Sequence, residues 1–306
     1  MNVLGIEIGG TKLQLVLASP AGEIRQRRKL PVATGSGAAA IRDQIARAIP
    51  DLVAGQSIDA VGVGFGGPVD WYTGKICCSH QIAGWSDFDL GDWLGRLTGV
   101  RVAVDNDANV AALGEASHGA GRGSDPVFYV TLGSGVGGGL VSGGKIYHGA
   151  TPGESEIGHL RLDRAGTTVE SRCSGWAVDA RIRELKGNKS DSLLARLAAN
   201  ERHGEAKHLG AALAQGDTAA RQLVEEIAND LAFGLSHVVH LLHPQVIVLG
   251  GGLSMVGEPL RAAVERALRG FTMTAFAPGP KLRLSQLGED AVPIGAVCLA
   301  GISAKG

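Results

Sequence analysis

Residues 3–18 read VLGIEIGGTKLQLVLA, and this stretch decides the fold. The apolar run Val3–Ile8 ends at Gly9-Gly10-Thr11, and a second apolar run, Leu13–Ala18, follows almost at once. Two β-like runs joined by a short glycine-containing turn predict a β-hairpin. Glycine in such a turn lets the backbone bend tightly or approach a ligand closely.

The same order of strand, glycine turn and strand returns in the second half of the chain. Val127–Leu132 is a predicted strand, residues 133–139 read GSGVGGG, and Leu140–Ser142 is the expected returning strand. The Gly- and Ser-rich segment 119–126 is the candidate boundary between the halves. This repetition predicts an internally duplicated α/β fold with a cleft between its two halves.

Further strands and helices are expected between these hairpins. Strands are expected at Ala60–Val63, Val100–Val104 and Val246–Leu249. Helical spacing predicts helices over Ala38–Ile49, Leu90–Leu97, Asn109–His118, Trp176–Leu185, Leu193–Glu201, Ala219–Leu242 and Ile294–Ser303.

Composition excludes several classes of protein. Twenty-nine Lys and Arg residues against 30 Asp and Glu residues give a net charge of −1, which argues against a nucleic-acid partner. The chain is 44% hydrophobic and 19% charged, as in soluble globular proteins. No apolar run reaches the roughly 18 residues of a membrane span, and the N-terminal residues do not resemble a signal peptide. We therefore expect a cytoplasmic protein with no membrane association.

Glycine is unusually frequent, with 47 residues in 306, and it clusters after β-like runs. This placement predicts glycine loops at strand ends, where α/β folds bind phosphate groups. Residues 62–67 and 133–138 both satisfy the GxGxxG pattern. No helix begins inside either motif, so neither predicts a dinucleotide site.

Two polar clusters carry the candidate chemistry. Asp105-Asn106-Asp107 ends a predicted strand directly before a helix, and one of these side chains is expected to cap that helix. Glu156 and His159 add a carboxylate and an imidazole after a Gly/Pro loop. Side chains two apart on a strand share a face, so strand geometry alone does not choose between the two aspartates.

In this order along the chain, six segments resemble the ROK family of sugar kinases and sugar-responsive repressors. They are Gly5–Leu13 (GIEIGGTKL), Val61–Asp70 (VGVGFGGPVD), Asp105–Glu115 (DNDANVAALGE), Thr131–Gly139 (TLGSGVGGG), Gly153–His159 (GESEIGH) and Val246–Ser254 (VIVLGGGLS). The resemblance implies the duplicated actin-like, ribonuclease H-like ATPase fold. It also implies that the C-terminal helix returns to the N-terminal domain, which gives expected domains of 1–118 with 293–306, and 119–292.

The resemblance implies an ATP- and Mg²⁺-dependent kinase that phosphorylates a hexose or N-acetylhexosamine, with O6 as the expected acceptor. Asp107 matches the general base, a role suited to a hydroxyl that must lose its proton as it attacks phosphorus. The residues that match sugar contacts are Gly67, Asn106, Asp107, Glu156, His159 and Glu170.

The phosphate and adenosine loops also carry over from the resemblance. The matching residues are Gly9, Gly10, Thr11 and Lys12 in the first loop, Gly133, Ser134 and Gly135 in the second, and Gly250, Gly251 and Gly252 in the adenosine loop. Backbone N–H groups of such loops face phosphates as an anion-binding nest does. The family also implies a homodimer.

The chain departs from the family pattern in three ways. Glu7 replaces the usual aspartate near a water-mediated magnesium site, so an extra methylene separates the carboxylate from the metal. The cysteine-rich zinc loop is missing: Glu170 comes only 11 positions after His159, and no cysteine lies between them, so no zinc is expected. Gly66 and Gln81 stand where the pattern has Pro and Asn.

These departures leave two alternatives to an ATP-dependent sugar kinase. The short loop also occurs in family members that accept polyphosphate, so polyphosphate is an alternative donor. Glu7 and the altered loop suggest a catalytically weak sugar sensor as the second alternative. The family's DNA-binding repressors carry an N-terminal helix-turn-helix segment, whereas here the phosphate hairpin begins at residue 3. We therefore do not expect DNA binding.

Overall fold

The predicted N-terminal hairpin is present and belongs to a five-stranded sheet. This computed structural model describes residues 2–32, 35, 37–79, 82–153, 155–188 and 191–303. Strand β1 (Val3–Ile8) pairs with β2 (Leu13–Ala18). The sheet has the order β3-β2-β1-β4-β7, completed by β3 (Ile24–Leu30), β4 (Ala60–Phe65) and β7 (Arg101–Asn106). Strands β1, β4 and β7 are parallel, so their carboxyl ends meet at one edge.

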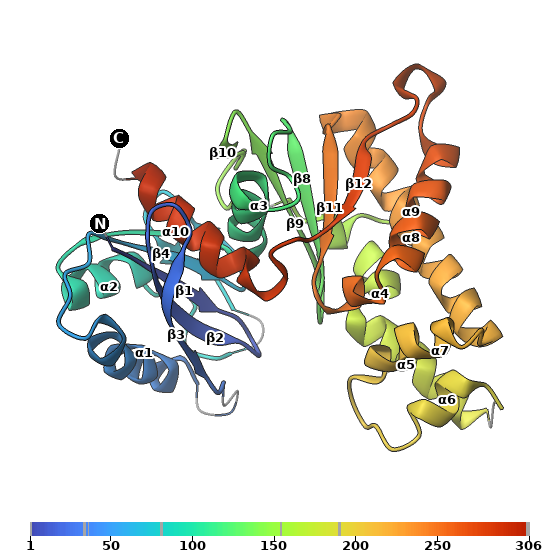
Figure 1. Cartoon of the computed structure of the whole chain (residues 1–306), viewed down its shortest axis with the longest axis horizontal. Helices are drawn as coiled ribbons and strands as arrows, with labels where there is room; N and C mark the ends of the chain where they lie inside the picture. Colours follow the sequence, from blue (N-terminus) through green and yellow to red (C-terminus); the bar gives the residue numbers. More distant parts are fainter. Residues whose placement is uncertain are drawn as a thin grey trace. The chain divides into compact units, whose positions relative to one another are not determined.

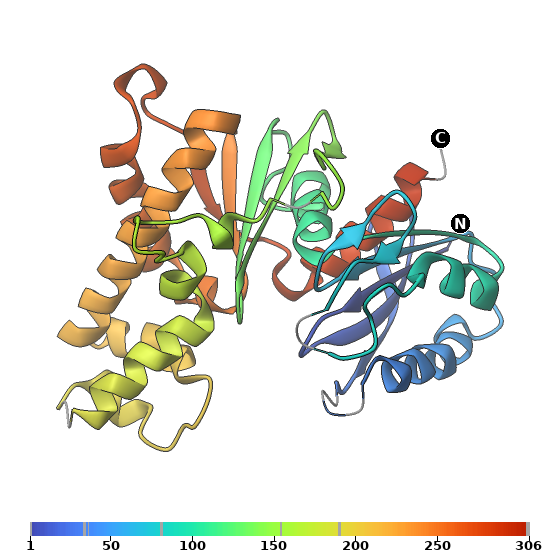
Figure 2. The same ribbon diagram turned by 180° about the vertical axis from the view of Figure 1, so that it is seen from behind.

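The chain divides into two compact units (Figures 1 and 2). Unit 1 contains Met1–Gly123, Gly139–Ser155 and Gln286–Gly306, and unit 2 contains Ser124–Gly138 and Glu156–Ser285. The domain limits given above, 1–118 with 293–306 and 119–292, stay a prediction.

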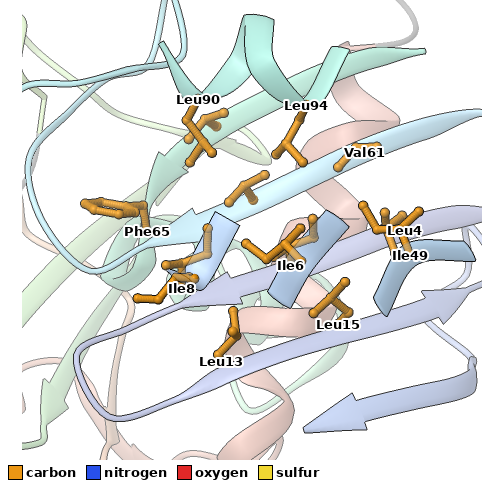
Figure 3. Close-up of a cluster of buried hydrophobic side chains, with 14 of the residues drawn as sticks. Leu4, Ile6, Ile8, Leu13, Leu15, Ile49, Val61, Phe65, Leu90 and Leu94 are labelled. Carbon is orange, nitrogen blue, oxygen red and sulfur yellow. The ribbon is translucent and has the colours of Figure 1, made fainter. Parts of the chain in front are cut away.

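One face of the unit 1 sheet holds the main apolar core (Figure 3). Alternate residues of β1, namely Leu4, Ile6 and Ile8, are almost fully buried in this cluster. Helices α1 (Gly37–Val53) and α2 (Leu90–Thr98) add side chains such as Ile49 and Leu94. This alternation is the period of two that a strand imposes on its side chains.

The opposite face of that sheet is covered by α10 (Ala291–Ser303). Val3 and Val16 of the sheet pack with Val297 and Ala300 of this helix. Helix α10 also packs against α3 (Asp107–His118). The C-terminal helix therefore returns to the N-terminal sheet, as the family resemblance implies.

Glycines allow α10 to approach both neighbours at backbone distance. A Cβ atom built on Gly62 of β4 would lie 1.8 Å from the Ala296 carbonyl oxygen, and one on Gly295 would lie 1.8 Å from the Val110 carbonyl oxygen. A Cβ atom on Gly5 would lie 2.8 Å from the Pro293 carbonyl oxygen. The glycine excess therefore does not serve strand-end loops alone, because part of it makes room between a sheet and two helices.

A second sheet has the order β10-β9-β8-β11-β12. Its strands are β8 (Val127–Leu132), β9 (Val136–Ser142), β10 (Lys145–Ile146), β11 (Val246–Gly250) and β12 (Lys281–Leu284). The longer helices of unit 2 are α5 (Gly175–Gly187), α8 (Thr218–Leu242) and α9 (Glu258–Phe271), and the shorter ones are α4 (Val169–Cys173), α6 (Leu193–Leu197) and α7 (Leu209–Ala214). Helix α8 packs along α9 and α4.

Most predicted elements are confirmed to within a few residues, and the differences have physical reasons. Helix α6 ends at Leu197, four residues before the predicted end. Strand β3 was not expected, because its sequence IRQRRKL lacks an apolar alternation. It is an edge strand, where charged side chains are tolerated and discourage pairing with another chain. Among the described residues, no helix has the length and apolar character of a membrane span.

Gly62→Ala tests the close packing of α10 on β4. The added methyl group would overlap the backbone of α10, so we expect a loss of at least about 2–3 kcal/mol in the free energy of unfolding. Denaturant unfolding followed by circular dichroism measures it. Gly270→Ala is the matched control, because Gly270 is exposed in α9 with open space around it. That change is expected to be neutral or stabilising, and equal stability of both variants would contradict the packing argument.

Candidate active site

The predicted site residues of unit 1 lie at the carboxyl edge of its parallel strands. Ile8 of β1 is in register with Phe65 of β4, which is in register with Asn106 of β7. The next residues along the three strands are therefore Gly9, Gly66 and Asp107. In open α/β sheets this edge is where ligands bind.

Asp107 is the first residue of α3 and lies against the two glycine turns. A Cβ atom built on Gly66 would lie 3.3 Å from Oδ2 of Asp107 and 3.3 Å from Cα of Gly9. The Gly66 N–H donates to the Ile8 carbonyl at 2.8 Å, and the Gly9 N–H donates to the Lys12 carbonyl at 2.7 Å. The carboxylate predicted to be the base is thus brought beside the turn predicted to bind phosphate.

Asn106 is the residue that caps α3. Its Oδ1 accepts from the backbone N–H groups of Ala108 at 2.8 Å and Asn109 at 3.3 Å. Its Nδ2 donates to the Gly67 carbonyl at 3.2 Å. The amide therefore ties the helix to the Gly66-Gly67 turn, and any sugar contact falls to its second Nδ2 hydrogen.

Asp105 is buried and takes part in a hydrogen-bond network with Asn106, Asn109 and His148. Its environment therefore differs from that of Asp107. Its Oδ1 accepts from the Asn106 N–H at 2.7 Å and from Nδ2 of Asn109 at 3.0 Å. Its Oδ2 lies 2.6 Å from Nε2 of His148. The His148 ring stacks on Trp71, with ring centroids 4.0 Å apart and planes inclined by 10°.

Glu7 lies buried on the opposite side of β1 from Ile6 and Ile8. Its register partner on β2 is Gln14, whose Nε2 donates to Oε2 of Glu7 at 2.5 Å. Burial raises the pKa of Glu7 above its ordinary value, and the Gln14 hydrogen bond and the nearby Lys12 charge offset part of this rise. Oε1 of Gln14 is buried and has no hydrogen-bond partner.

Lys12 lies in the exposed turn between β1 and β2, as does Thr11. Nζ of Lys12 is 3.7 Å from Glu289, and Nζ of Lys29 is 2.7 Å from the same carboxylate. These lysines lower the pKa of Glu289. The Lys12 ammonium group is therefore held at the surface beside the β1–β2 turn. An exposed ion pair of this kind adds little stability but leaves the ammonium group accessible.

The predicted residues of unit 2 gather around Val136, which opens β9. Oε2 of Glu170, in α4, accepts from the Val136 N–H at 2.9 Å. A Cβ atom on Gly135 would lie 2.5 Å from the same oxygen, and the Gly133 carbonyl accepts from the Gly175 N–H at 2.7 Å. Glu170 thus lies directly on the Gly133-Ser134-Gly135 loop.

A short 3₁₀ turn, Ile157–His159, packs on the same strand; Glu156 precedes this turn and His159 ends it. A Cβ atom on Gly158 would lie 2.2 Å from the Val136 carbonyl oxygen, so only glycine permits this approach. The turn is closed by the His159 N–H, which donates to the Glu156 carbonyl at 3.1 Å. Both side chains are exposed.

The predicted adenosine loop lies at the end of β11, beside the end of β8. Gly250 is in parallel register with Thr131. Gly251 has φ +80°, and a Cβ atom there would lie 2.5 Å from the Leu132 carbonyl carbon. Gly252 follows as an exposed residue. The two glycine loops of unit 2 therefore share one edge of the second sheet.

Some functional candidates were missed from the sequence. Gln14 had a usable signal, since a hairpin that pairs Ile8 with Leu13 must place Gln14 opposite Glu7. His148 and Trp71 had none, because their contact joins two loops far apart in the chain. Gln81, which departs from the family pattern together with Gly66, lies outside the described residues.

Comparison with known proteins gives a consistent family assignment. The model of the ROK family matches residues 3–302. A glucokinase from Halalkalibacterium halodurans is 34% identical over 95% of this chain and 92% of its own length. The crystal structure of a ROK family glucokinase from Streptomyces griseus, in complex with glucose and AMPPNP, is 30% identical, with a TM-score of 0.86 over 99% of this chain and all of that one.

A third relative is the ROK hexokinase from Thermus thermophilus, which is 29% identical, with a TM-score of 0.82 over all of this chain and 99% of that one. These similarities confirm the predicted α/β fold of the actin-like ATPases and support the predicted class of enzyme, a sugar kinase. The chain belongs to the ROK family.

Proposed function

We propose that this protein transfers the γ-phosphate of ATP to O6 of a hexose or N-acetylhexosamine, with Asp107 as the general base. The observation that carries the proposal is the position of Asp107 Oδ2 beside Gly66 and Gly9. A carboxylate there can accept the hydroxyl proton next to the turn that would hold the phosphates. The glucose and AMPPNP complex of the relative from Streptomyces griseus supports both substrate classes.

The sugar oxygen would bond to the γ-phosphorus while the bond from phosphorus to the β-bridging oxygen breaks. The proton of the sugar hydroxyl passes to the Asp107 carboxylate, and ADP leaves. Such a reaction needs mainly positioning and charge neutralisation. In unit 1, the turn at Gly9-Gly10-Thr11-Lys12 would position the phosphates and neutralise their charge. In unit 2, the same tasks would fall to the loops at Gly133-Ser134-Gly135 and Gly250-Gly251-Gly252.

The sugar would be oriented by hydrogen bonds between its hydroxyls and the Gly67 turn, Asn106, Glu156, His159 and Glu170, with the carboxylates as acceptors. Glu170 has one oxygen bound to the Val136 N–H, which fixes its carboxylate and leaves the other oxygen for a hydroxyl. A site built from such fixed acceptors discriminates among sugars by which hydroxyls it pairs.

Magnesium fits the residues around Glu7. The Glu7 carboxylate and the unpartnered Oε1 of Gln14 are both oxygen acceptors, and they can receive hydrogen bonds from metal-bound water. Bound magnesium would neutralise charge on the phosphates. Glu7 and Gln14 would hold its water shell, because Mg²⁺ prefers to keep several waters. The cytoplasmic location and the homodimer implied by the family also remain predictions.

One assay tests the proposal directly. ADP release is measured by a coupled assay against a panel of hexoses and N-acetylhexosamines, and sugar phosphate formation is measured with polyphosphate in place of ATP. Phosphorylation of one sugar class with ATP is expected. Turnover with polyphosphate alone would identify the alternative donor, and sugar binding without turnover would identify a sensor.

Asp107→Asn tests the base. The amide keeps the shape of the carboxylate but cannot accept the proton, so kcat should fall about 10²- to 10⁴-fold. Sugar affinity, measured by calorimetry, should change far less because several other residues bind the hydroxyls. Asp51→Asn, an exposed change on α1, is the matched control and should leave kcat unchanged. Wild-type turnover in Asp107→Asn would exclude this residue as the base.

Glu7→Gln tests the magnesium proposal through two opposite effects. Because burial raises the folded pKa of Glu7 above 4.5, its contribution to stability is complete below about pH 4.5 and is lost as pH rises through the folded pKa. The neutral amide avoids this loss, so Tm should rise by about 2 °C at pH 7 and little at pH 4.5. The magnesium concentration for half-maximal activity should rise, and kcat should fall. An unchanged magnesium requirement would assign Glu7 a structural role.

The absence of zinc is the third prediction for the site. Cys173, the cysteine next after Glu170, is buried, and burial raises the pKa of its thiol to about 12, which disfavours a thiolate ligand. We expect elemental analysis to find no stoichiometric zinc and a zinc-selective chelator to leave activity intact in excess magnesium. One zinc per chain would refute this expectation.

A further inference from the structure

Asp105 is a buried carboxylate that the proposed reaction does not use. It is 2% exposed and lies two residues before Asp107. Its Oδ1 accepts from the Asn106 N–H at 2.7 Å, so the carboxylate holds the backbone at the start of α3. A carboxylate held this deeply needs a donor for its other oxygen as well, because an unpaired buried charge is costly.

His148 supplies that donor from a distant segment. Its Nε2 is 2.6 Å from Oδ2 of Asp105, and an ionised carboxylate only accepts hydrogen bonds, so the Nε2 atom carries the proton. The imidazole side chain is 14% exposed. Its ring stacks on Trp71, with centroids 4.0 Å apart, so the ring is held by a hydrogen bond at its edge and by an indole on its face.

A second tie joins the same two regions. Nδ2 of Asn109 donates to Oδ1 of Asp105 at 3.0 Å and to the Gly153 carbonyl at 2.8 Å. The segment 148–153 is therefore attached at both of its ends to the junction of β7 and α3, at Asp105 and at Asn109. Three residues after Gly153, the chain reaches Glu156, a proposed sugar contact.

We infer that His148 is a positioning residue: clamped between Trp71 and Asp105, it fixes the Asn106-Asp107 junction and the segment that leads to the proposed sugar contacts. This inference rests on the proposed sugar-kinase activity. His148 touches neither the proton nor the phosphate in this scheme. It acts by holding the base carboxylate in place, and a misplacement of about 1 Å can cost about 10²-fold in rate.

Two substitutions separate the hydrogen bond from the ring. His148→Phe keeps a ring to stack on Trp71 but leaves Oδ2 of Asp105 without its donor. His148→Gln loses the ring but retains an N–H group that can reach Asp105. If the hydrogen bond sets the position of Asp107, the glutamine variant should rescue most of the loss seen with phenylalanine.

The experiment measures kcat, the KM for sugar and the KM for ATP well below the Tm of each variant. We expect His148→Phe to lower kcat about 10- to 100-fold, with an unchanged KM for ATP, and His148→Gln to recover to within severalfold of wild type. The stoichiometry of AMPPNP binding, measured by calorimetry, should stay at the wild-type value, because the folded fraction is unchanged. His203→Phe, at an exposed histidine, is the matched control.

Several outcomes would overturn the inference. Wild-type kcat in His148→Phe would overturn it. Equal losses of kcat in His148→Phe and His148→Gln, together with a reduced stoichiometry of AMPPNP binding, would also overturn it, because they indicate a merely structural role. If His148→Phe does not fold, His148→Ala replaces it. That variant also removes the donor to Asp105, so kcat should fall about 10- to 100-fold, and wild-type kcat in it would refute the inference. A wild-type protein without turnover on any sugar is a different result, because it rejects the proposed function itself.

Discussion

The backbone-to-backbone approach of α10 to β4 and α3 is the constraint on which unit 1 depends. No side chain larger than a hydrogen atom fits at Gly62 or Gly295, where a Cβ atom would come within 1.8 Å of a carbonyl oxygen. Because α10 also packs on α3, the helix that begins at Asp107 is held between this neighbour and the strand end that precedes it. The position of the proposed base is therefore a product of packing as much as of hydrogen bonding.

Two buried carboxylates near the proposed site, Asp105 and Glu7, differ in their effect on stability. The Asp105 carboxylate is fully paired, with donors from Asn109 of α3, from the Asn106 backbone and from His148 in a remote loop. Glu7 has one strong donor, and its burial raises its pKa. A buried carboxylate that is incompletely paired lowers stability at neutral pH, and such a cost is typical of positions that are kept for binding or catalysis.

The sequence was sufficient for the fold and for the order of the site segments. Hairpin patterning located β1, β2 and β8 with their observed limits. It placed Gly62 inside a strand and Gly64 just after it, but it did not reveal that both make room for a helix, because a missing side chain does not show which element fills its space. The clamp of His148 by Trp71 was also beyond prediction, since it depends on two loops meeting in space. Local patterns encode elements, whereas contacts between remote loops depend on the finished packing.

Helix α10 has a consequence for how the chain folds during synthesis. Unit 1 includes residues up to Ser155 and then again from Gln286, so about 130 residues of unit 2 are made in between. At about 5–20 residues per second, the ribosome needs roughly 7–26 s to reach the helix that covers the first sheet. During that interval the sheet face with Val3 and Val16 lacks its partner. The nascent chain therefore carries this apolar surface uncovered until α10 has been synthesised.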